Sequence, residues 1–341
     1  MKKIFSIFFV LGISLIVFEF FLGYSPFKRG ISPVEYNPNI GMWHKKNFTN
    51  VLIKECFSNQ YSFDEKGRVN NNYIYDKKKK DIIILGDSYI DALMVKNKNI
   101  IHNRLYSELN GSFNVLNYGL TGSGPMQQLS ILNHEVNLTK VKRVIQFIYL
   151  EDDLGDCDPQ KFNGSNRPKV FMEFSTLEKF KLHKPAAYSI KEKIRDVLGN
   201  FEFYSYLNKT WFYYKSFFDE VEMTDQKKDF NITTMQNEEF RWKQLEGTIY
   251  QMKKVAIENT FQYNVILFSH DEITFDNKER SLRLENILHT HNISFLNISI
   301  FLKKLAKNRN ISYSCDTHWN DSTHVSLAEY IKDKLFKMKE R

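Results

Sequence analysis

The sequence contains few cysteines, no internal repeat and no motif typical of nucleic-acid-binding modules. Its three cysteines, Cys56, Cys157 and Cys315, are far apart in a chain of 341 residues. Their odd number and wide spacing match neither the disulfide framework of small secreted domains nor the paired cysteines of a zinc site. A bond between Cys56 and Cys157 is compatible with the sequence but cannot be deduced from it. We therefore predict no metal and no nucleic-acid partner.

Acidic residues are outnumbered by basic ones, which gives a formal charge of +8 at pH 7. Most of the lysines are scattered, and only residues 77–80 form a run. Scattered lysines are typical of solvated surfaces. An attraction to anionic glycans or lipid headgroups is the alternative interpretation.

The amino terminus is the one long apolar run. Lys2 and Lys3 precede residues 4–22, in which Glu19 is the only charged residue. As a helix this run would be roughly 28 Å long, close to the hydrocarbon thickness of about 30 Å. No small-x-small cleavage site follows, and the two lysines favour a cytoplasmic amino terminus. Residues 1–24 are thus predicted to be an uncleaved, single-pass signal anchor, with a cleaved leader as the alternative. The rest of the chain would then lie outside the cytoplasm, in the periplasm or the extracellular space.

Residues 25–80 are polar and rich in asparagine, and they contain Pro26, Pro33 and Pro38. This composition predicts a stalk that packs partly on the following domain and carries no chemistry.

From residue 81 onward, short apolar runs alternate with helical patterns. The runs that predict strands are Asp81–Leu85, Phe113–Leu120, Arg143–Leu150, Asn264–Phe268 and Ile293–Leu296. Strands that alternate with helices through short links predict an α/β domain with a parallel, doubly wound sheet over residues 81–341. Four consecutive apolar residues follow Asp81, so the first strand is predicted to be buried on both faces.

An aromatic-rich segment, about residues 159–240, interrupts this alternation. We interpret it as a helical insert. Its rings either form the insert's own core or provide a lid or platform for a sugar or acyl chain.

Two short stretches carry residues suited to nucleophilic catalysis. Gly86-Asp87-Ser88 follows the first strand, at the carboxyl edge where open α/β sheets place their ligands. Near the other end of the chain, Asp316 and His318 lie two positions apart. A serine nucleophile needs a base, and the base needs an acceptor that fixes its tautomer. His318 and Asp316 are predicted to fill these two roles for Ser88.

On these residues the sequence resembles the SGNH, or GDSL-type, hydrolases over about residues 81–337. Gly86-Asp87-Ser88 resembles the block with the nucleophile, and Asp316-Thr317-His318-Trp319-Asn320 the block with the acid and base. The glycine of Asn117-Tyr118-Gly119 would give an N–H to the oxyanion hole together with the Ser88 N–H. The resemblance implies a flavodoxin-like three-layer α/β/α sandwich with about five parallel strands. It also implies acyl-ester chemistry without metal or organic cofactor, in a membrane-anchored bacterial branch.

Two positions depart from the family pattern. The family has an asparagine at the end of the third strand, where it donates to the oxyanion, and this chain has Asp152. An ionised carboxylate cannot donate and repels an anion, and losing such a donor typically costs about 3 kcal/mol. The missing oxyanion donor could be replaced in two ways. Asp152 could be protonated, or another group could donate, namely Gln146, Tyr149 or the Ser88 N–H. The second departure is the spacing of the acid and base, which is Asp-x-His here and commonly Asp-x-x-His in the family. Asp321 and His324 do have the commoner Asp-x-x-His spacing.

The leading functional hypothesis is an esterase that acts on acyl or acetyl esters of small molecules or of an envelope or extracellular glycan. A glycan O-acyltransferase would use the same residues, with a glycan hydroxyl in place of water. Asp152 motivates a third hypothesis, a catalytically silent extracytoplasmic binding or assembly protein.

Overall fold

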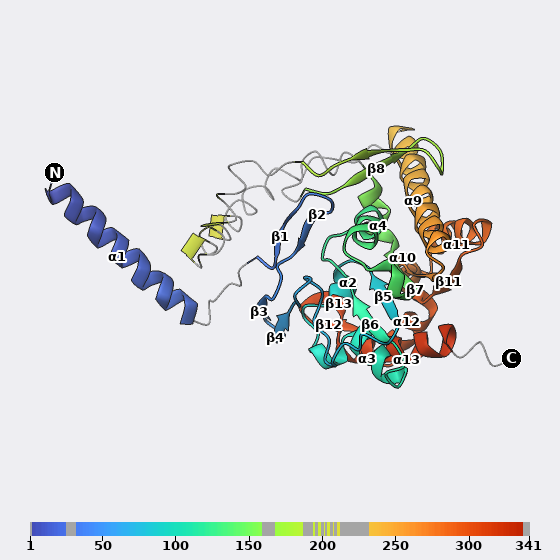
Figure 1. The fold of residues 1–341 in the computed structure, drawn as a ribbon, viewed down its shortest axis with the longest axis horizontal. Coiled ribbons are helices and arrows are strands. Elements are labelled where there is room, and N and C mark those ends of the chain that lie inside the picture. The colour runs from blue at the N-terminus through green and yellow to red at the C-terminus, as the bar shows by residue number, and fades with distance from the viewer. Residues whose placement is uncertain are drawn as a thin grey trace. The chain divides into compact units, whose positions relative to one another are not determined.

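The computed structural model describes residues 2–24, 32–158, 168–186 and 232–336, with isolated positions between 194 and 211 (Figure 1). They belong to two compact units. One contains Met1–Glu35 and Tyr188–Asn231, and the other contains Tyr36–Ala187 and Ile232–Arg341.

The first unit is built on helix α1 (Lys2–Tyr24), which coincides with the predicted signal anchor. Glu19 of this helix accepts a hydrogen bond from the Phe203 N–H at 2.8 Å, and Phe18 meets the Phe203 ring edge-on. Within the described ranges, no helix combines the length and the apolar character that a membrane crossing requires. The predicted transmembrane span is therefore not supported.

A five-stranded parallel sheet forms the centre of the second unit. The strand order is β11-β10-β7-β5-β6, and every neighbouring pair is parallel. The strands are β5 (Asp81–Leu85), β6 (Asn114–Asn117), β7 (Val141–Tyr149), β10 (Gln262–Phe268) and β11 (Ser294–Asn297). The predicted α/β class and the five parallel strands are confirmed. The observed strands differ from the predicted ones only at their ends, by up to a few residues.

Strand β5 lies between β7 and β6, and all five of its residues are buried. Its alternate side chains face opposite sides of the sheet. Ile82 and Ile84 pack with Leu105 and Leu327 in one core. Complete burial of an isoleucine is worth about 1.5–3 kcal/mol, so the isoleucines of β5 fix it as an interior strand of the sheet.

Helices cover the sheet and connect its strands. The longer ones are α3 (Ile101–Glu108), α4 (Pro125–His134), α9 (Ile232–Glu258), α11 (Glu279–Thr290), α12 (Ser299–Ala306) and α13 (Asp321–Leu335). The shorter ones are α2 (Ser88–Asp91), η1 (Asn97–Asn99), η2 (Leu138–Lys140), α5 (Leu150–Asp153), η3 (Gly155–Cys157) and α10 (His270–Phe275). Helices α3, α12 and α13 contribute to the core of Ile82 and Ile84, and α9 contacts β10 and α4. The α13 cap is Asn320, which accepts from the Thr323 N–H at 3.1 Å.

The predicted helical insert contains an antiparallel hairpin, β8 (Phe171–Phe174) with β9 (Phe180–His183). The helical interpretation is wrong for these residues. The hairpin packs on α9, where the Gln244 Oε1 accepts from the Phe174 N–H at 2.6 Å. Most of the predicted insert between residues 187 and 231 lies outside the described residues.

The predicted stalk is folded and belongs to the same unit as the sheet from residue 36 onward. It forms two antiparallel pairs, β1 (Val34–Asn37) with β2 (Gly41–His44) and β3 (Thr49–Lys54) with β4 (Phe57–Ser62). The buried side chains of Phe63 and Val69 pack with Val95 and Ile100 of the domain. These two positions of residues 25–80 are apolar, although the composition of the whole segment is polar.

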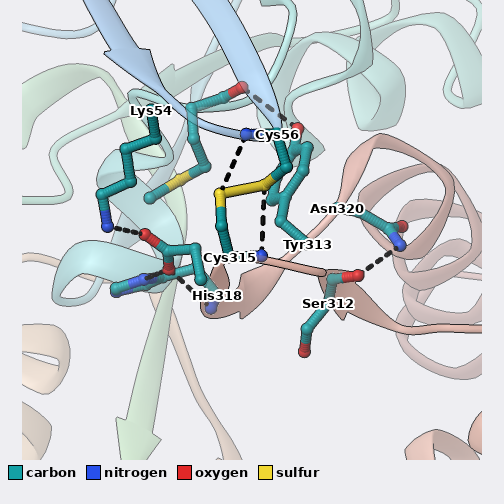
Figure 2. Close-up of a disulfide and its surroundings, with 9 residues drawn as sticks. Lys54, Cys56, Ser312, Tyr313, Cys315, His318 and Asn320 are labelled. Carbon is teal, nitrogen blue, oxygen red and sulfur yellow. Dashed lines mark hydrogen bonds and ion pairs between the residues drawn. A yellow bond between two sulfur atoms is a disulfide. The ribbon is translucent and has the colours of Figure 1, made fainter.

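One disulfide joins the hairpin β3–β4 to the carboxyl-terminal part of the chain (Figure 2). It links Cys56 to Cys315 with a Cα–Cα distance of 5.8 Å, whereas Cys157 is free and buried. The pairing of Cys56 with Cys157 that the sequence left open is therefore wrong. Sequence spacing cannot reveal that residues separated by 259 positions meet.

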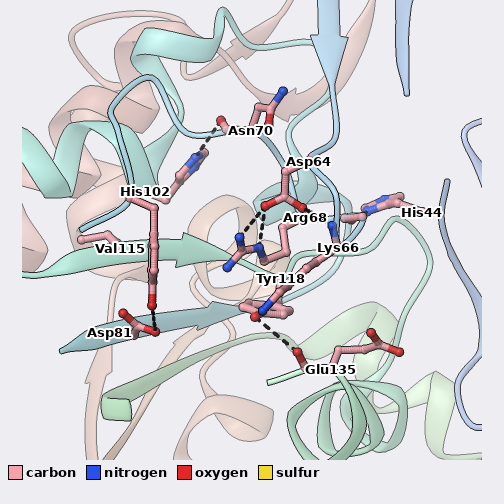
Figure 3. Close-up of polar contacts among 12 residues, drawn as sticks. His44, Asp64, Lys66, Arg68, Asn70, Asp81, His102, Val115, Tyr118 and Glu135 are labelled. Atoms are coloured by element: carbon pink, nitrogen blue, oxygen red, sulfur yellow. Dashed lines mark hydrogen bonds and ion pairs between the residues drawn. The ribbon is translucent and has the colours of Figure 1, made fainter. Parts of the chain in front are cut away.

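Polar contacts fasten residues 64–70 to the sheet and to α3 (Figure 3). The Arg68 Nε donates to the Asp64 Oδ2 at 2.7 Å, and its guanidinium lies over the Tyr118 ring. His102 is completely buried, with its Nε2 3.2 Å from the Asn70 carbonyl oxygen. Burial lowers the pKa of His102 to about 3, so this ring is neutral at physiological pH.

His102 makes the fold sensitive to acid. Its pKa in the unfolded chain is about 6.5, so the unfolded state takes up a proton below that pH while the folded state does not. The contribution of His102 to the unfolding free energy is fully present above pH 6.5 and decreases as the pH falls toward 3. Between pH 7 and pH 5, the wild type should lose about 2 kcal/mol more unfolding free energy than His102→Gln, measured by urea denaturation. The same loss in both proteins would contradict this, and His289→Gln, at an exposed position, is the control.

Candidate active site

Ser88 is the first residue of α2, directly after the turn that ends β5. Asp87 caps this helix, and its Oδ1 accepts from the Tyr89 N–H at 2.9 Å. Burial, followed by the charges of Asp152 and Asp156, raises the pKa of Asp87 to about 7. The serine therefore stands at the carboxyl edge of the sheet, next to a carboxyl group that is partly protonated near neutral pH.

Asp316 and His318 lie on strand β13 (Asp316–Trp319), which pairs with β12 (Ser312–Tyr313). Because residues two apart on a strand face the same side, the Asp-x-His spacing brings both side chains together. The Asp316 Oδ1 contacts the His318 Nδ1 and accepts from the His318 N–H at 3.0 Å. On the other side of the ring, the His318 Nε2 lies 2.7 Å from the Ser88 Oγ. The structure thus brings Ser88, His318 and Asp316 into one hydrogen-bonded chain.

Asp321 and His324, the pair with the commoner spacing, have other surroundings. Asp321 accepts from Asn99 at 2.8 Å and from the Tyr313 hydroxyl at 2.6 Å. His324 is buried in α13 beside Trp319, and its burial lowers its pKa to about 4. This pair stabilises the structure around β12 and α13.

The Asp316 carboxylate is almost completely buried, with 4% of its side chain exposed. Burial by itself would raise its pKa. Hydrogen bonds from Lys54 and from the backbone and ring of His318 outweigh that effect and lower the pKa of Asp316 to about 2. Asp316 is therefore ionised at any pH at which the protein would work.

Gly119 was predicted to give its N–H to an oxyanion, and the structure gives this N–H another partner. It donates to the Asn117 Oδ1 at 2.8 Å. A Cβ on Gly119 would lie 2.4 Å from the Asp91 N, so glycine is required here for the close approach of the loop to α2. The loop continues to Gly122, which has a φ of 76° that favours glycine. Among the described residues, neither the Gly122 N–H nor the Ser88 N–H has an acceptor.

The Leu120 N–H and the Ser123 hydroxyl donate to the Gly86 carbonyl oxygen at 3.0 and 3.1 Å. The loop is therefore tied to the turn that presents Ser88.

Asp152 lies on α5 after β7, with an exposed side chain. Its charge contributes to the raised pKa values of Asp87 and Tyr89, which places it in the electrostatic environment of the site. Gln146 is not a substitute donor. Its Nε2 donates to the Gln128 Oε1 at 2.7 Å, and its Oε1 accepts from the Tyr263 hydroxyl.

A groove of about 1010 Å³ lies beside the triad. Its lining includes Tyr149 and Phe268 at the carboxyl ends of β7 and β10, His318 on β13, Tyr89 on α2 and His270 on α10. Lys54 of the hairpin β3–β4 lines it as well. The sequence analysis missed Lys54, because a lysine in a polar segment has no pattern that distinguishes it from a solvated one.

No protein-family model matches the chain, and no curated protein matches it. Among solved structures, it is similar to a lipolytic protein of the G-D-S-L family from Desulfitobacterium hafniense, at 13% identity over 74% of this chain and 98% of that chain, with a TM-score of 0.42. A G-D-S-L family member from Veillonella parvula matches at 12% identity over 75% of this chain and 98% of that chain, with a TM-score of 0.42. The acetylxylan esterase Axe2 from Geobacillus stearothermophilus matches at 11% identity over 74% and 93%, with a TM-score of 0.39. At these identities the similarity is one of fold.

Proposed function

We propose that this protein is a serine ester hydrolase that cleaves acyl or acetyl esters through Ser88, His318 and Asp316. The observation that carries the proposal is the hydrogen-bonded chain from the Ser88 Oγ through the His318 ring to the Asp316 carboxylate. This order of donor and acceptor atoms is what activation of a serine hydroxyl requires.

In the first half of the reaction, the His318 Nε2 takes the Ser88 hydroxyl proton while the Ser88 Oγ attacks the ester carbonyl carbon. Asp316 holds the Nδ1 side of the ring and stabilises the imidazolium that forms. His318 then gives the proton to the leaving alcohol as the ester bond breaks, and an acyl-Ser88 remains. In the second half, water attacks this acyl group with the same proton transfers, which releases the carboxylic acid.

The negative oxygen of the tetrahedral intermediate needs donors at the site. We propose the backbone N–H groups of Ser88 and Gly122 for this role, in place of Gly119. Two observations support this choice: both N–H groups lack an acceptor among the described residues, and the loop with Gly122 is bonded to Gly86. The preferred substrate would be an ester of a small molecule or of an envelope or extracellular glycan, accommodated in the groove beside His318.

Covalent labelling tests this function directly. A fluorophosphonate should modify Ser88 in the purified full-length protein, and peptide mass spectrometry should locate the adduct there. His318→Ala should abolish the labelling because the serine is then no longer activated. A folded protein that remains unlabelled would contradict the proposal. A labelled protein is then screened on short-chain esters and acetylated glycans, with and without added glycan acceptors, to separate hydrolysis from acyl transfer.

We further propose that the domain functions outside the cytoplasm, attached to a membrane through residues 1–24. The Cys56–Cys315 disulfide supports an oxidising compartment, where such bonds persist. In cells, these two cysteines should resist maleimide labelling until a reductant is added, and the full-length chain should sediment with membranes. Reduced cysteines, or a chain recovered in the cytosolic fraction, would contradict the proposed location.

A further inference from the structure

The tip of the hairpin β3–β4 is fastened to residues 313–316, which lead into the strand with the acid and base of the site. Three contacts make this connection, and Figure 2 shows two of them, the disulfide and the ion pair of Lys54. Cys56 is bonded to Cys315, the residue before Asp316. The Phe57 ring lies 4.9 Å from the Tyr313 ring, and the Lys54 ammonium forms an ion pair with the Asp316 Oδ2.

Lys54 supplies the partner that the second oxygen of Asp316 requires. The Asp316 Oδ1 is occupied by the backbone and ring of His318. The Oδ2 is buried on a side chain that is 4% exposed, whereas the Lys54 side chain is 46% exposed. A buried carboxylate oxygen without a donor is unfavourable, which favours rotation of the carboxylate away from its position. The lysine thus fixes the carboxylate plane that orients the imidazole.

We propose that Lys54 is a positioning residue of the hydrolase site, and that the Cys56–Cys315 disulfide holds it against Asp316. This inference rests on the proposed function. It has two consequences. The first is that Lys54 orients His318 through Asp316. The second is that the enzyme has full activity only when the disulfide is formed.

The titratable groups that face Asp316 and His318 come from several elements. Lys54 lies on β3, Tyr89 on α2, Tyr313 on β12 and His324 on α13. Burial raises the pKa values of Tyr89 and Tyr313, and it lowers that of His324. All three are thus neutral over the working pH range. Among these groups, Lys54 is the one whose charge acts on His318 from outside the triad.

Lys54→Met removes the charge and retains most of the apolar stem. On p-nitrophenyl acetate, kcat should fall about tenfold with little change in KM, because one hydrogen bond to a charged group is lost. Lys54→Arg should restore most of the lost kcat. Lys303→Met removes a surface ion pair with Asp276 at 2.9 Å and is the matched control, with unchanged kinetics.

The disulfide is tested by a double-mutant cycle. Cys56→Ser with Cys315→Ser should lower kcat as Lys54→Met does. In the Lys54→Met background, the same pair of substitutions should change kcat less than twofold, because the disulfide acts through the lysine. Additive effects on kcat, or a change in Tm alone, would mean that the disulfide only stabilises the fold and would overturn the coupling.

The outcomes separate this inference from the proposed function. If the wild type is not labelled by a fluorophosphonate at Ser88, the hydrolase proposal fails. If Ser88 is labelled but Lys54→Met retains the wild-type kcat, the hydrolase proposal stands and the role of Lys54 is refuted.

Discussion

Ser88→Ala is expected to lower kcat for ester hydrolysis by about 10⁴–10⁶-fold and to abolish fluorophosphonate labelling. Without the Oγ there is no acyl-enzyme, and the donors of the oxyanion hole can only assist direct attack by water. The measurement is the hydrolysis rate of p-nitrophenyl acetate over the background rate, with circular dichroism to establish that the variant is folded.

His318→Ala should cost nearly as much as Ser88→Ala, and the double variant should cost little more than either one. Residues that act as one unit show this non-additivity. Ser112→Ala, in the loop before β6, is a matched control outside the site. A labelled Ser88→Ala protein, or multiplicative losses in the double variant, would show that the nucleophile is a different residue.

Asp152→Asn is expected to raise kcat by about 10²-fold. Removal of one oxyanion donor usually lowers kcat by about this factor, so the gain of a donor should raise it by a similar one. The substitution replaces a repelling carboxylate with an amide that can donate, on an exposed side chain whose change should not disturb the core. It should also lower the pKa of Asp87, because the charge of Asp152 contributes to raising it.

The measurement compares kcat and kcat/KM for the wild type, Asp152→Asn and Asp152→Ala. A gain in the asparagine variant alone identifies a new hydrogen bond. Equal gains in both variants mean that removal of the charge is sufficient. No change in either would mean that the backbone donors already serve the oxyanion, and the idea of a site weakened by Asp152 would be wrong. A wild type without any activity that Asp152→Asn activates would favour the silent protein of the third hypothesis.

The sheet could be predicted because its signals are local. A run such as Ile82–Leu85 encodes its own burial, and the alternation of such runs with helical patterns encodes a parallel sheet. The insert was misjudged at β8–β9, because aromatic residues favour strands as much as they favour a helical core.

Ser88, Asp316 and His318 were predicted from short motifs, and the structure places them together although 228 positions separate Ser88 from Asp316. The Gly119 N–H is bonded to Asn117 in the structure, and a sequence does not show which N–H of a glycine-rich loop is already bonded. Lys54 and the Cys56–Cys315 pair were missed for a related reason. Their importance depends on contacts between distant segments, and no local pattern records such contacts.

The 259 positions that separate Cys56 from Cys315 also determine the order in which the molecule can be completed. During synthesis or export, Ser88 and Cys56 appear early, whereas Cys315, Asp316 and His318 appear last. The proposed nucleophile therefore remains without its proposed base for most of that time, and under the proposed function an incomplete chain could not cleave esters in the compartment where it is made. Cys56 can meet only Cys157 during the same interval. In the folded protein Cys157 is buried. Cys315 is therefore the cysteine to which Cys56 can bond in a correctly folded chain.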